Sequence, residues 1–296
     1  MELSWLTKLR IVAVLALGCM GLGVAAWPLV APADPLGVVS ASNLHMAETI
    51  ELIGLSALIG FAAYFVGWPY GRQIGVLAVP AGLAVWAIRS DEVLRLIQMA
   101  PDVPGKLRVY AMLRWDSLIW LVLIGAGLVG LWLASKLRPA PPYIDPVQAS
   151  RPKAKVSFDL VSALVLSLVI GHLLISALAQ GTRVIGSSIP TQPATAQIAF
   201  AVMVAFGTAG FVTGKFLCLG PFWPTVASAA LPIVVGLFYA KVALLEPLGR
   251  YYPATCFPNP VLAVLPVQMV AFGALGATAG YWMAVRFKYW RLQQSA

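Results

Sequence analysis

Long apolar segments recur along the whole chain, and polar or Pro-rich connections separate each segment from the next. A bilayer core of about 30 Å requires roughly 20 mostly apolar residues per helix. The segments that meet this requirement are 10–30, 49–68, 73–88, 117–135, 158–180, 194–214, 223–245 and 262–285. The longest connections are 31–48, 89–116 and 136–157, so none has room for a soluble catalytic domain. The pattern predicts an all-α, polytopic membrane protein with eight transmembrane helices.

The composition argues against a water-soluble fold. Of the 296 residues, 60% are hydrophobic and only 10% are charged, whereas a soluble domain carries about 25% charged residues. The net charge of +9 would suggest nucleic-acid binding in a soluble protein. In a membrane protein the charge has to be interpreted loop by loop. We therefore expect the lipid bilayer, and not nucleic acid, as the partner of this chain.

The basic residues predict the direction in which the chain crosses the membrane. With the N-terminus in the cytoplasm, twelve of the 20 Lys and Arg residues lie inside, seven lie outside, and Lys241 falls within a segment. The twelve are Lys8, Arg10, Arg72, Lys136, Arg138, Arg151, Lys153, Lys155, Lys215, Arg286, Lys288 and Arg291. Because basic loops stay on the cytoplasmic side, we expect a multi-pass protein of the cell (inner) membrane with both termini in the cytoplasm.

The first apolar segment has a second interpretation as a secretory signal. Lys8 and Arg10 precede it, and residues 31–33 (APA) resemble a signal-peptide cleavage site. Its length of about 20 residues exceeds that of a typical signal core, and the repeat described next requires this helix. We expect the segment to be retained as a transmembrane helix.

The chain carries signs of an internal duplication. Segment 130–138 (GLWLASKLR) matches segment 280–288 (GYWMAVRFK) at an offset of 150 residues. In the same way, Phe65-Val66 and Val79-Pro80 of the first half are matched by Phe211-Val212 and Leu231-Pro232 of the second half. In such segments a small residue lets helices approach, a Trp lies at head-group level, and basic residues end the span. Four crossings return the chain to the same side, so the pattern predicts two parallel four-helix repeats.

The predicted boundaries follow from this duplication. The first repeat covers 1–138, a Pro-rich basic linker covers 139–157, and the second repeat covers 158–296. The prolines of the linker favour an extended segment on the cytoplasmic face. On the other side of the membrane, segment 91–99 has apolar residues on one side of a short helix, which is typical of an interfacial element.

Ionisable and strongly polar residues within the segments are the candidates for function, because such residues are costly in a bilayer. His45, Glu48 and Glu51 recur at intervals of three, so they can line one side of a helix. His172 lies past the middle of the fifth segment, Gln197 is the repeat counterpart of Glu51, and Lys241 lies near the end of the seventh. The predicted ligand or ion pathway, on the outer side, consists of Glu51, His172, Gln197 and Lys241.

Other interpretations of the polar residues stay open. His45 and Glu48 offer one nitrogen and one carboxylate to a metal, although no HxxxH or CxxC spacing accompanies them. A haem would need the only two histidines, His45 and His172, as its axial pair. The four-plus-four arrangement is similar to that of haem A synthases, whose bundles carry more histidines. Alternatively, water, head groups and backbone satisfy all of these side chains, and Lys241 extends to the interface.

Two classes of function fit these observations. The first is a non-catalytic subunit or assembly factor of a larger membrane complex, with other membrane-protein subunits as partners, because soluble parts are almost absent. The second is a permease or channel for a small solute or ion with an outward-facing polar site. A haem- or metal-binding protein comes third. No nucleophile elbow, phosphate loop or paired-carboxylate motif favours an enzyme, and the residues identify no cofactor.

Overall fold

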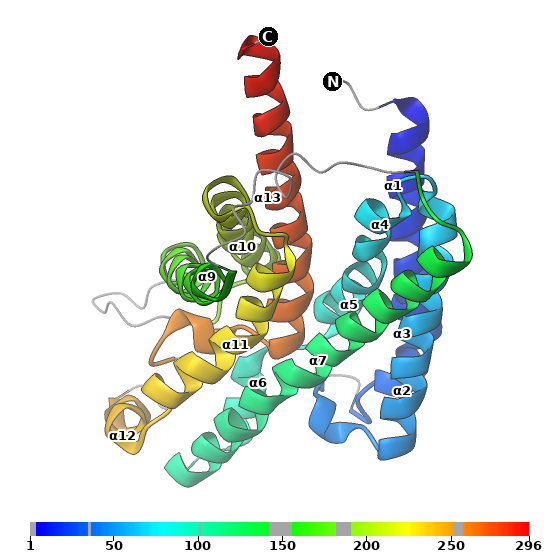
Figure 1. Ribbon diagram of the computed structural model, residues 1–296. Helices are drawn as coiled ribbons and strands as arrows, with labels where there is room; N and C mark the ends of the chain where they lie inside the picture. The colour runs from blue at the N-terminus through cyan, green and yellow to red at the C-terminus, as the bar shows by residue number, and fades with distance from the viewer. Residues whose placement is uncertain are drawn as a thin grey trace. The chain divides into compact units, whose positions relative to one another are not determined.

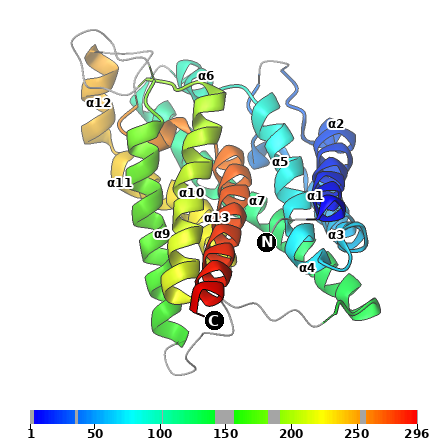
Figure 2. The ribbon, with the colours of Figure 1, turned by 90° about the horizontal axis from the view of Figure 1, so that it is seen from above.

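The computed structural model describes residues 4–34, 37–100, 102–141, 156–181, 191–251 and 257–295, and their secondary structure is entirely helical (Figure 1). The chain separates into two compact units. The first combines Met1–Ser90 with Leu118–Tyr143, and the second combines Asp91–Ser117 with Ile144–Ala296. Figure 2 shows the helices from a second direction. Most of the predicted linker 139–157 lies outside the described residues, and the predicted domain boundaries stay a prediction.

Within the described residues, seven helices are long and apolar enough to cross a membrane. They are Trp5–Ala25, Met46–Gly67, Gly71–Arg89, Val103–Leu137, Phe158–Leu178, Thr195–Leu217 and Phe222–Tyr239. The chain is therefore an all-helical protein of the multi-pass membrane class. The eighth predicted segment, 262–285, falls largely in α13 (Pro266–Ser295), which is not among these seven. Residues 261–274 are all buried, and a helix enclosed by other helices needs fewer large apolar side chains than one that faces lipid.

The helix that contains the fourth predicted segment is longer than the sequence predicts. α7 runs over Val103–Leu137 and has 35 residues, which is about 52 Å at 1.5 Å per residue. The bilayer core is only about 30 Å thick. Placing all of 89–116 in a connection was wrong, because the charged residues there interrupt the apolar run but not the helix. Tyr110 and Leu113 are buried with Lys106 and Asp116, at spacings that put them along a helix.

The seventh predicted segment, 223–245, is also divided differently in the structure. α11 covers Phe222–Tyr239 and stops where Ala240 leaves the helical conformation at φ −82° and ψ 73°. A separate helix, α12, covers Val242–Tyr251. Lys241 therefore lies in the short connection between two helices and not within a span. The short helix predicted over 91–99 is present as α6 (Val93–Gln98).

The first unit is held together where helix backbones meet. It contains α1 (Trp5–Gly18), α3 (Met46–Gly67), α4 (Gly71–Ile74), α5 (Ala78–Arg89) and the second half of α7. A Cβ atom on Gly130 would overlap the carbonyl oxygen of Ala57, so α3 and α7 are in backbone contact. Beside this contact, buried Tyr64 packs on Leu131 and donates its hydroxyl to the Arg138 carbonyl at 2.6 Å.

The first span is not a regular α-helix throughout. A π-helical segment, Cys19–Ala25, continues α1, followed by the short helices α2 (Trp27–Val30) and η2 (Ala41–Asn43). The indole Nε1 of Trp86 on α5 donates to the Gly23 carbonyl at 3.1 Å. A π turn replaces the usual i to i−4 bonding, so a carbonyl in this segment can accept a bond from a neighbouring helix.

The second unit is built around α10 (Thr195–Leu217) and α11, which both pack against α13 and α9 (Val156–Leu178). A Cβ atom on Gly280 would overlap the carbonyl oxygen of Gly207, and one on Gly276 would overlap that of Met203. α10 and α13 are thus in backbone contact along more than one turn.

The two ends of the second unit differ in character. At the end that we call the loop end, α9 and α11 finish and α10 and α13 begin. α12 follows α11 there, η4 (Pro260–Ala263) precedes α13, and α6 contacts η4. At the other, basic end, the Lys288 ammonium donates to Cys218 Sγ at 3.1 Å. The Lys215 ammonium there lies 4.4 Å from the centroid of the Phe287 ring.

One methyl group tests the backbone contact between α10 and α13. Because its Cβ would overlap the Gly207 carbonyl, we expect Gly280→Ala to lower the free energy of unfolding by about 1–3 kcal/mol. Gly125→Ala is the matched control, since nothing lies within 4 Å of a Cβ at Gly125. Thermal unfolding of the detergent-purified protein measures both variants. Equal stability of the two would contradict the contact.

Candidate functional site

The loop end of the second unit is organised by glutamine side chains that bond to backbone groups. The Gln192 Oε1 accepts a hydrogen bond from the Leu94 N–H at 3.3 Å, and its Nε2 donates to the Ala263 carbonyl at 3.1 Å. One side chain therefore joins α6 to η4. Asn259 caps η4 by accepting from the Val261 N–H at 2.9 Å.

Gln197, one of the predicted pathway residues, has a structural role here. Its Nε2 donates to the carbonyls of Leu178 and Gln180, both at 2.8 Å. The last carbonyls of a helix have no partner within that helix, so Gln197 of α10 satisfies the end of α9. This arrangement joins the start of α10 to the end of α9.

His172 lies on α9 with its ring against α11. Its imidazole stacks on the ring of Tyr239, with centroids 6.0 Å apart and planes inclined by 24°. The Nδ1 atom is buried and has no hydrogen-bond partner. Ser176, one turn further along α9, likewise has a buried hydroxyl without a partner. Buried polar groups in folded proteins are nearly always bonded, so these two atoms have bonding capacity that the fold leaves unused.

Arg114 approaches the same end of α11 from the first half of α7. Its Nη2 lies 3.5 Å from the Gly236 carbonyl, which is a long hydrogen bond. The Nε atom is buried without a partner. A Cβ atom on Gly236 would lie 3.3 Å from Nε, so the absence of a side chain at this position lets the guanidinium come close.

Sequence reasoning missed Arg114 because it assigned the residue to a loop. The signal that could have revealed it is the spacing of Tyr110 and Arg114, four residues apart on what proves to be one helix. Lys106 and Asp116 of this helix are only 6% and 4% exposed, and both have interaction partners. A charged, buried helix side cannot be recognised from an apolar pattern.

The predicted pathway residues fall in different parts of the structure. His172, Gln197 and Lys241 belong to the second unit, whereas Glu51 is on α3 of the first. Lys241 is exposed, and its ammonium lies 6.0 Å from the Phe238 ring centroid. His172 contacts the last residue of α11, Tyr239, and Lys241 follows two positions later. The joint pathway of all four residues stays a prediction.

The predicted metal ligands His45 and Glu48 lie at the start of α3. The Glu48 carboxylate accepts a hydrogen bond from the His45 backbone N–H at 2.8 Å, and so it caps the helix. In the part of the chain that the structure describes, no group of three or more His, Cys, Asp or Glu side chains is placed to hold a metal ion. The metal and haem assignments stay predictions.

Neighbouring groups shift the pKa values of Asp91 and Glu92, the two acids just before α6. Arg95 forms an ion pair with Asp91 at 2.6 Å. Burial acts to raise the pKa of Asp91, but the hydrogen bond and charge of Arg95 outweigh it and the pKa is lowered. Burial and the Asp91 charge both raise the pKa of Glu92.

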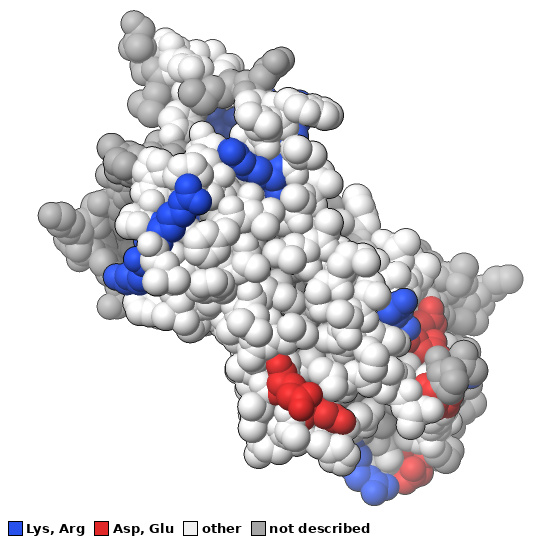
Figure 3. Space-filling model, turned by 90° about the vertical axis from the view of Figure 1, so that its right-hand side faces the viewer, with Lys and Arg blue, Asp and Glu red and all other residues white. Residues whose placement is uncertain are grey.

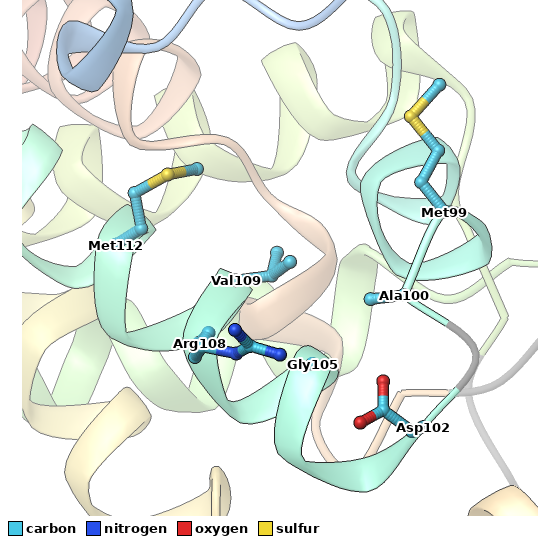
Figure 4. A pocket seen from close by; sticks show the side chains of 7 residues that line it. All are labelled: Met99, Ala100, Asp102, Gly105, Arg108, Val109 and Met112. Atoms are coloured by element: carbon cyan, nitrogen blue, oxygen red, sulfur yellow. The ribbon is translucent and has the colours of Figure 1, made fainter.

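A groove of about 340 Å³ lies between α6 and the start of α7 (Figure 4). It is lined by Met99, Ala100, Asp102, Gly105, Arg108, Val109 and Met112. The lining combines apolar side chains with one carboxylate and one guanidinium. It therefore offers an amphipathic surface but no pair of groups suited to acid–base catalysis.

Comparisons with known proteins give no further assignment: no family model, curated protein or solved structure matches the chain.

Gln197→Ala distinguishes a structural role from a role in a pathway. Because the substitution leaves the Leu178 and Gln180 carbonyls without their donor, we expect faster amide hydrogen exchange in the last turn of α9 and the first turn of α10. We also expect a loss of stability of about 1 kcal/mol per hydrogen bond. Thr208→Ala, at an exposed site on the same helix, is the control. Unchanged exchange in Gln197→Ala would contradict the structural role.

Proposed function

We propose that this integral membrane protein is a non-catalytic subunit or assembly factor of a larger membrane complex. The complex would be bound through the exposed side of α3. The observation that carries the proposal is an exposed carboxylate, Glu51, within an apolar membrane span. Figure 3 shows one face of the molecule, which is mostly uncharged and on which charged side chains are few. Glu48, three positions earlier, caps the start of the helix, whereas Glu51 lies further into the apolar span.

The exposed side of α3 has the form of a helix-binding surface. Ala47, Glu51, Gly54 and Leu58 are all exposed, and their spacings of four, three and four residues align them along one side of the helix. Nothing lies within 4 Å of a Cβ at Gly54. Small residues in such a row allow another transmembrane helix to approach closely.

The position of Glu51 in the span indicates which polar group the partner helix needs. The residue lies five positions after the start of α3 at Met46, which is about 7.5 Å along the axis. An acidic residue at the centre of a transmembrane helix costs about 2.5–3.5 kcal/mol on insertion scales, and the cost falls toward the interface. A partner helix with a basic or other hydrogen-bond donor at this depth would offset it. We therefore propose a transmembrane helix of another subunit as the occupant.

Matching glycine contacts support two repeats with the same topology. Two backbone contacts of the first unit have counterparts 150 residues later: Gly60 with Gly127 and Gly130 with Ala57, against Gly210 with Ala277 and Gly280 with Gly207. In this register Phe211 corresponds to Phe61 and not to Phe65. We propose on this basis that α13 is the eighth span, as α7 is the fourth.

The proposed topology also has a sidedness. In the first unit, the Arg72 guanidinium donates to Ser135 Oγ at 3.2 Å, and Arg138 lies over the Trp68 ring at 4.0 Å. These basic residues gather where α3 and α7 end, as Lys215 and Lys288 do where α10 and α13 approach their ends. The positive-inside rule then supports an inner-membrane protein with both termini in the cytoplasm.

A second candidate function is a permease or channel for a small solute or ion. The observation that favours it is the buried, unpartnered Nδ1 of His172, because unpaired polar atoms inside a membrane protein are typical of substrate and ion pathways. On this hypothesis Glu51, His172, Gln197 and Lys241 belong to one outward-facing path.

Blocking the α3 surface tests the subunit proposal. We expect the wild-type chain, solubilised in mild detergent from its native membranes, to migrate as a particle larger than the purified chain. Gly54→Leu should shift it to the size of the chain alone, because the new side chain projects into the space that the partner helix would occupy. Glu51→Gln should weaken the association by removing the charge.

Gly125→Leu is the matched control, since its Cβ position is also open, and it should leave the large particle intact. Size-exclusion chromatography measures all four proteins. Wild-type protein that already migrates alone would refute the proposal, and so would a large particle that survives Gly54→Leu. A particle of two copies of this chain would replace the foreign subunit with a homodimer.

Reconstituted vesicles test the permease alternative. We expect uptake of the transported solute to be lost in Glu51→Gln and in His172→Ala, since both residues would line the path, while the thermal unfolding of both variants stays close to that of the wild type. Tyr70→Phe, at an exposed position, is the control. Uptake that is unchanged in His172→Ala would eliminate this function.

A further inference from the structure

We propose that the second unit binds an oxyanion, a phosphate or carboxylate group, at the last turn of α11, and that Arg114 is its principal ligand-binding residue. The site is formed by Arg114 of α7, by His172 of α9, and by Gly236 and Tyr239 of α11. It goes beyond both candidate functions, because it would exist in a subunit as well as in a permease.

Contacts with one short stretch of α11 bring the site residues together. Arg114 reaches Gly236, with Nη2 at 3.5 Å from its carbonyl oxygen. His172 stacks on Tyr239, only three residues further along the same helix, which is about 4.5 Å along its axis. Ser176 follows His172 by one turn, which leads toward the end of α9 and away from the level of Gly236, so it lies outside this site. Helices from three parts of the chain thus converge at one turn.

Two groups in this cluster have bonding capacity that the fold does not use. The Arg114 Nε and the His172 Nδ1 are each buried without a hydrogen-bond partner. A buried polar group left unsatisfied costs about 1–3 kcal/mol, and more if it is charged. The guanidinium also makes only one long bond through Nη2. A ligand that accepted these hydrogen bonds would remove the cost.

The chemistry of the two groups defines the class of ligand. Arginine offers five N–H donors and no acceptor, and neutral histidine can donate from either ring nitrogen. The planar guanidinium matches carboxylate and phosphate oxygens, and such charge-assisted bonds are about twice as strong as neutral ones. A compact group with several acceptor oxygens and a negative charge is the ligand that fits.

Charges near the site favour an anion. Lys241, two positions after Tyr239, adds a second positive charge at the end of α11. The nearest acid on α7 is Asp116, two positions from Arg114, and residues i and i+2 of a helix do not face each other. Asp116 is also engaged in an interaction of its own.

The absence of a side chain at Gly236 lets Arg114 approach α11 closely. Any side chain there would begin 3.3 Å from Arg114 Nε, which is tight enough to move the guanidinium. Gly236→Ala is therefore a second way to perturb the site without removing a charged group.

The position of the site admits two sources of the oxyanion. α7 is longer than a bilayer core requires, so its first half, which carries Arg114, can extend into the head-group region. The group could be a free anion from the aqueous phase or the phosphate of a lipid. Both sources share the same chemistry, and separate probes distinguish them.

Ligand-dependent stabilisation in detergent provides the test. Thermal unfolding of the full chain is followed against increasing inorganic phosphate, acetate or dihexanoyl phosphatidic acid, with chloride matching the ionic strength. A ligand that binds only the folded state raises the unfolding temperature as its concentration exceeds its dissociation constant. We expect Arg114→Gln to weaken binding of the effective probe at least tenfold, and His172→Ala to weaken it several-fold.

Arg108→Gln is the matched control, because Arg108 is an exposed arginine on the same helix and lines the separate groove. It should bind as the wild type does. If Arg114→Gln does not fold, Gly236→Ala replaces it, with a weakening of binding expected as well. Arg114→Lys should recover part of the affinity, because it restores the charge but not the planar fork.

Each outcome of this experiment either supports or overturns the proposal. Binding of phosphate or acetate that depends on Arg114 supports a site for a free anion, and binding of phosphatidic acid alone that depends on Arg114 supports a lipid head-group site. Absence of binding for all three probes overturns the proposal. Equal losses in Arg114→Gln and Arg108→Gln also overturn it, because they would reflect net charge and not this site.

Discussion

Direct contact between helix backbones is the interaction on which both units depend. Where Gly280 meets Gly207, and where Gly130 meets Ala57, there is no space for a single additional carbon atom. In a membrane the hydrophobic effect does little to hold helices together, so close packing between them supplies much of the stabilisation. Glycine is required here for its lack of volume.

The polar side chains serve the same purpose of holding backbone to backbone. Gln192 joins α6 to η4, Gln197 satisfies the end of α9, and Trp86 bonds to the π-helical segment of the first span. Each ties a helix end or an irregular turn to a neighbouring element. Because backbone groups that lack partners are costly in an apolar environment, these residues stabilise the irregular parts of the fold.

Among the described residues, a few buried side-chain nitrogen and oxygen atoms have no hydrogen-bond partner. Arg114 and His172 each keep a buried nitrogen without a hydrogen-bond partner beside the end of α11, and Glu51 exposes a carboxylate within an apolar span. We propose a ligand for the first pair and a partner helix for Glu51. The protein thus has an interior and a lateral surface on which function can be tested separately.

The sequence by itself determined the membrane class, the helical content and most of the spans, because a segment must be apolar over about 20 residues to cross a bilayer. It also predicted Glu51 and His172 as candidates, since ionisable residues inside apolar segments are rare. Only the tertiary structure decided that α7 begins at Val103, that Lys241 lies between helices and that Gln197 caps α9. The contact of Arg114 with Gly236 could not be predicted either, because it depends on how α7 and α11 pack. Hydropathy is a property of each segment alone, whereas these features depend on contacts between residues far apart in the chain.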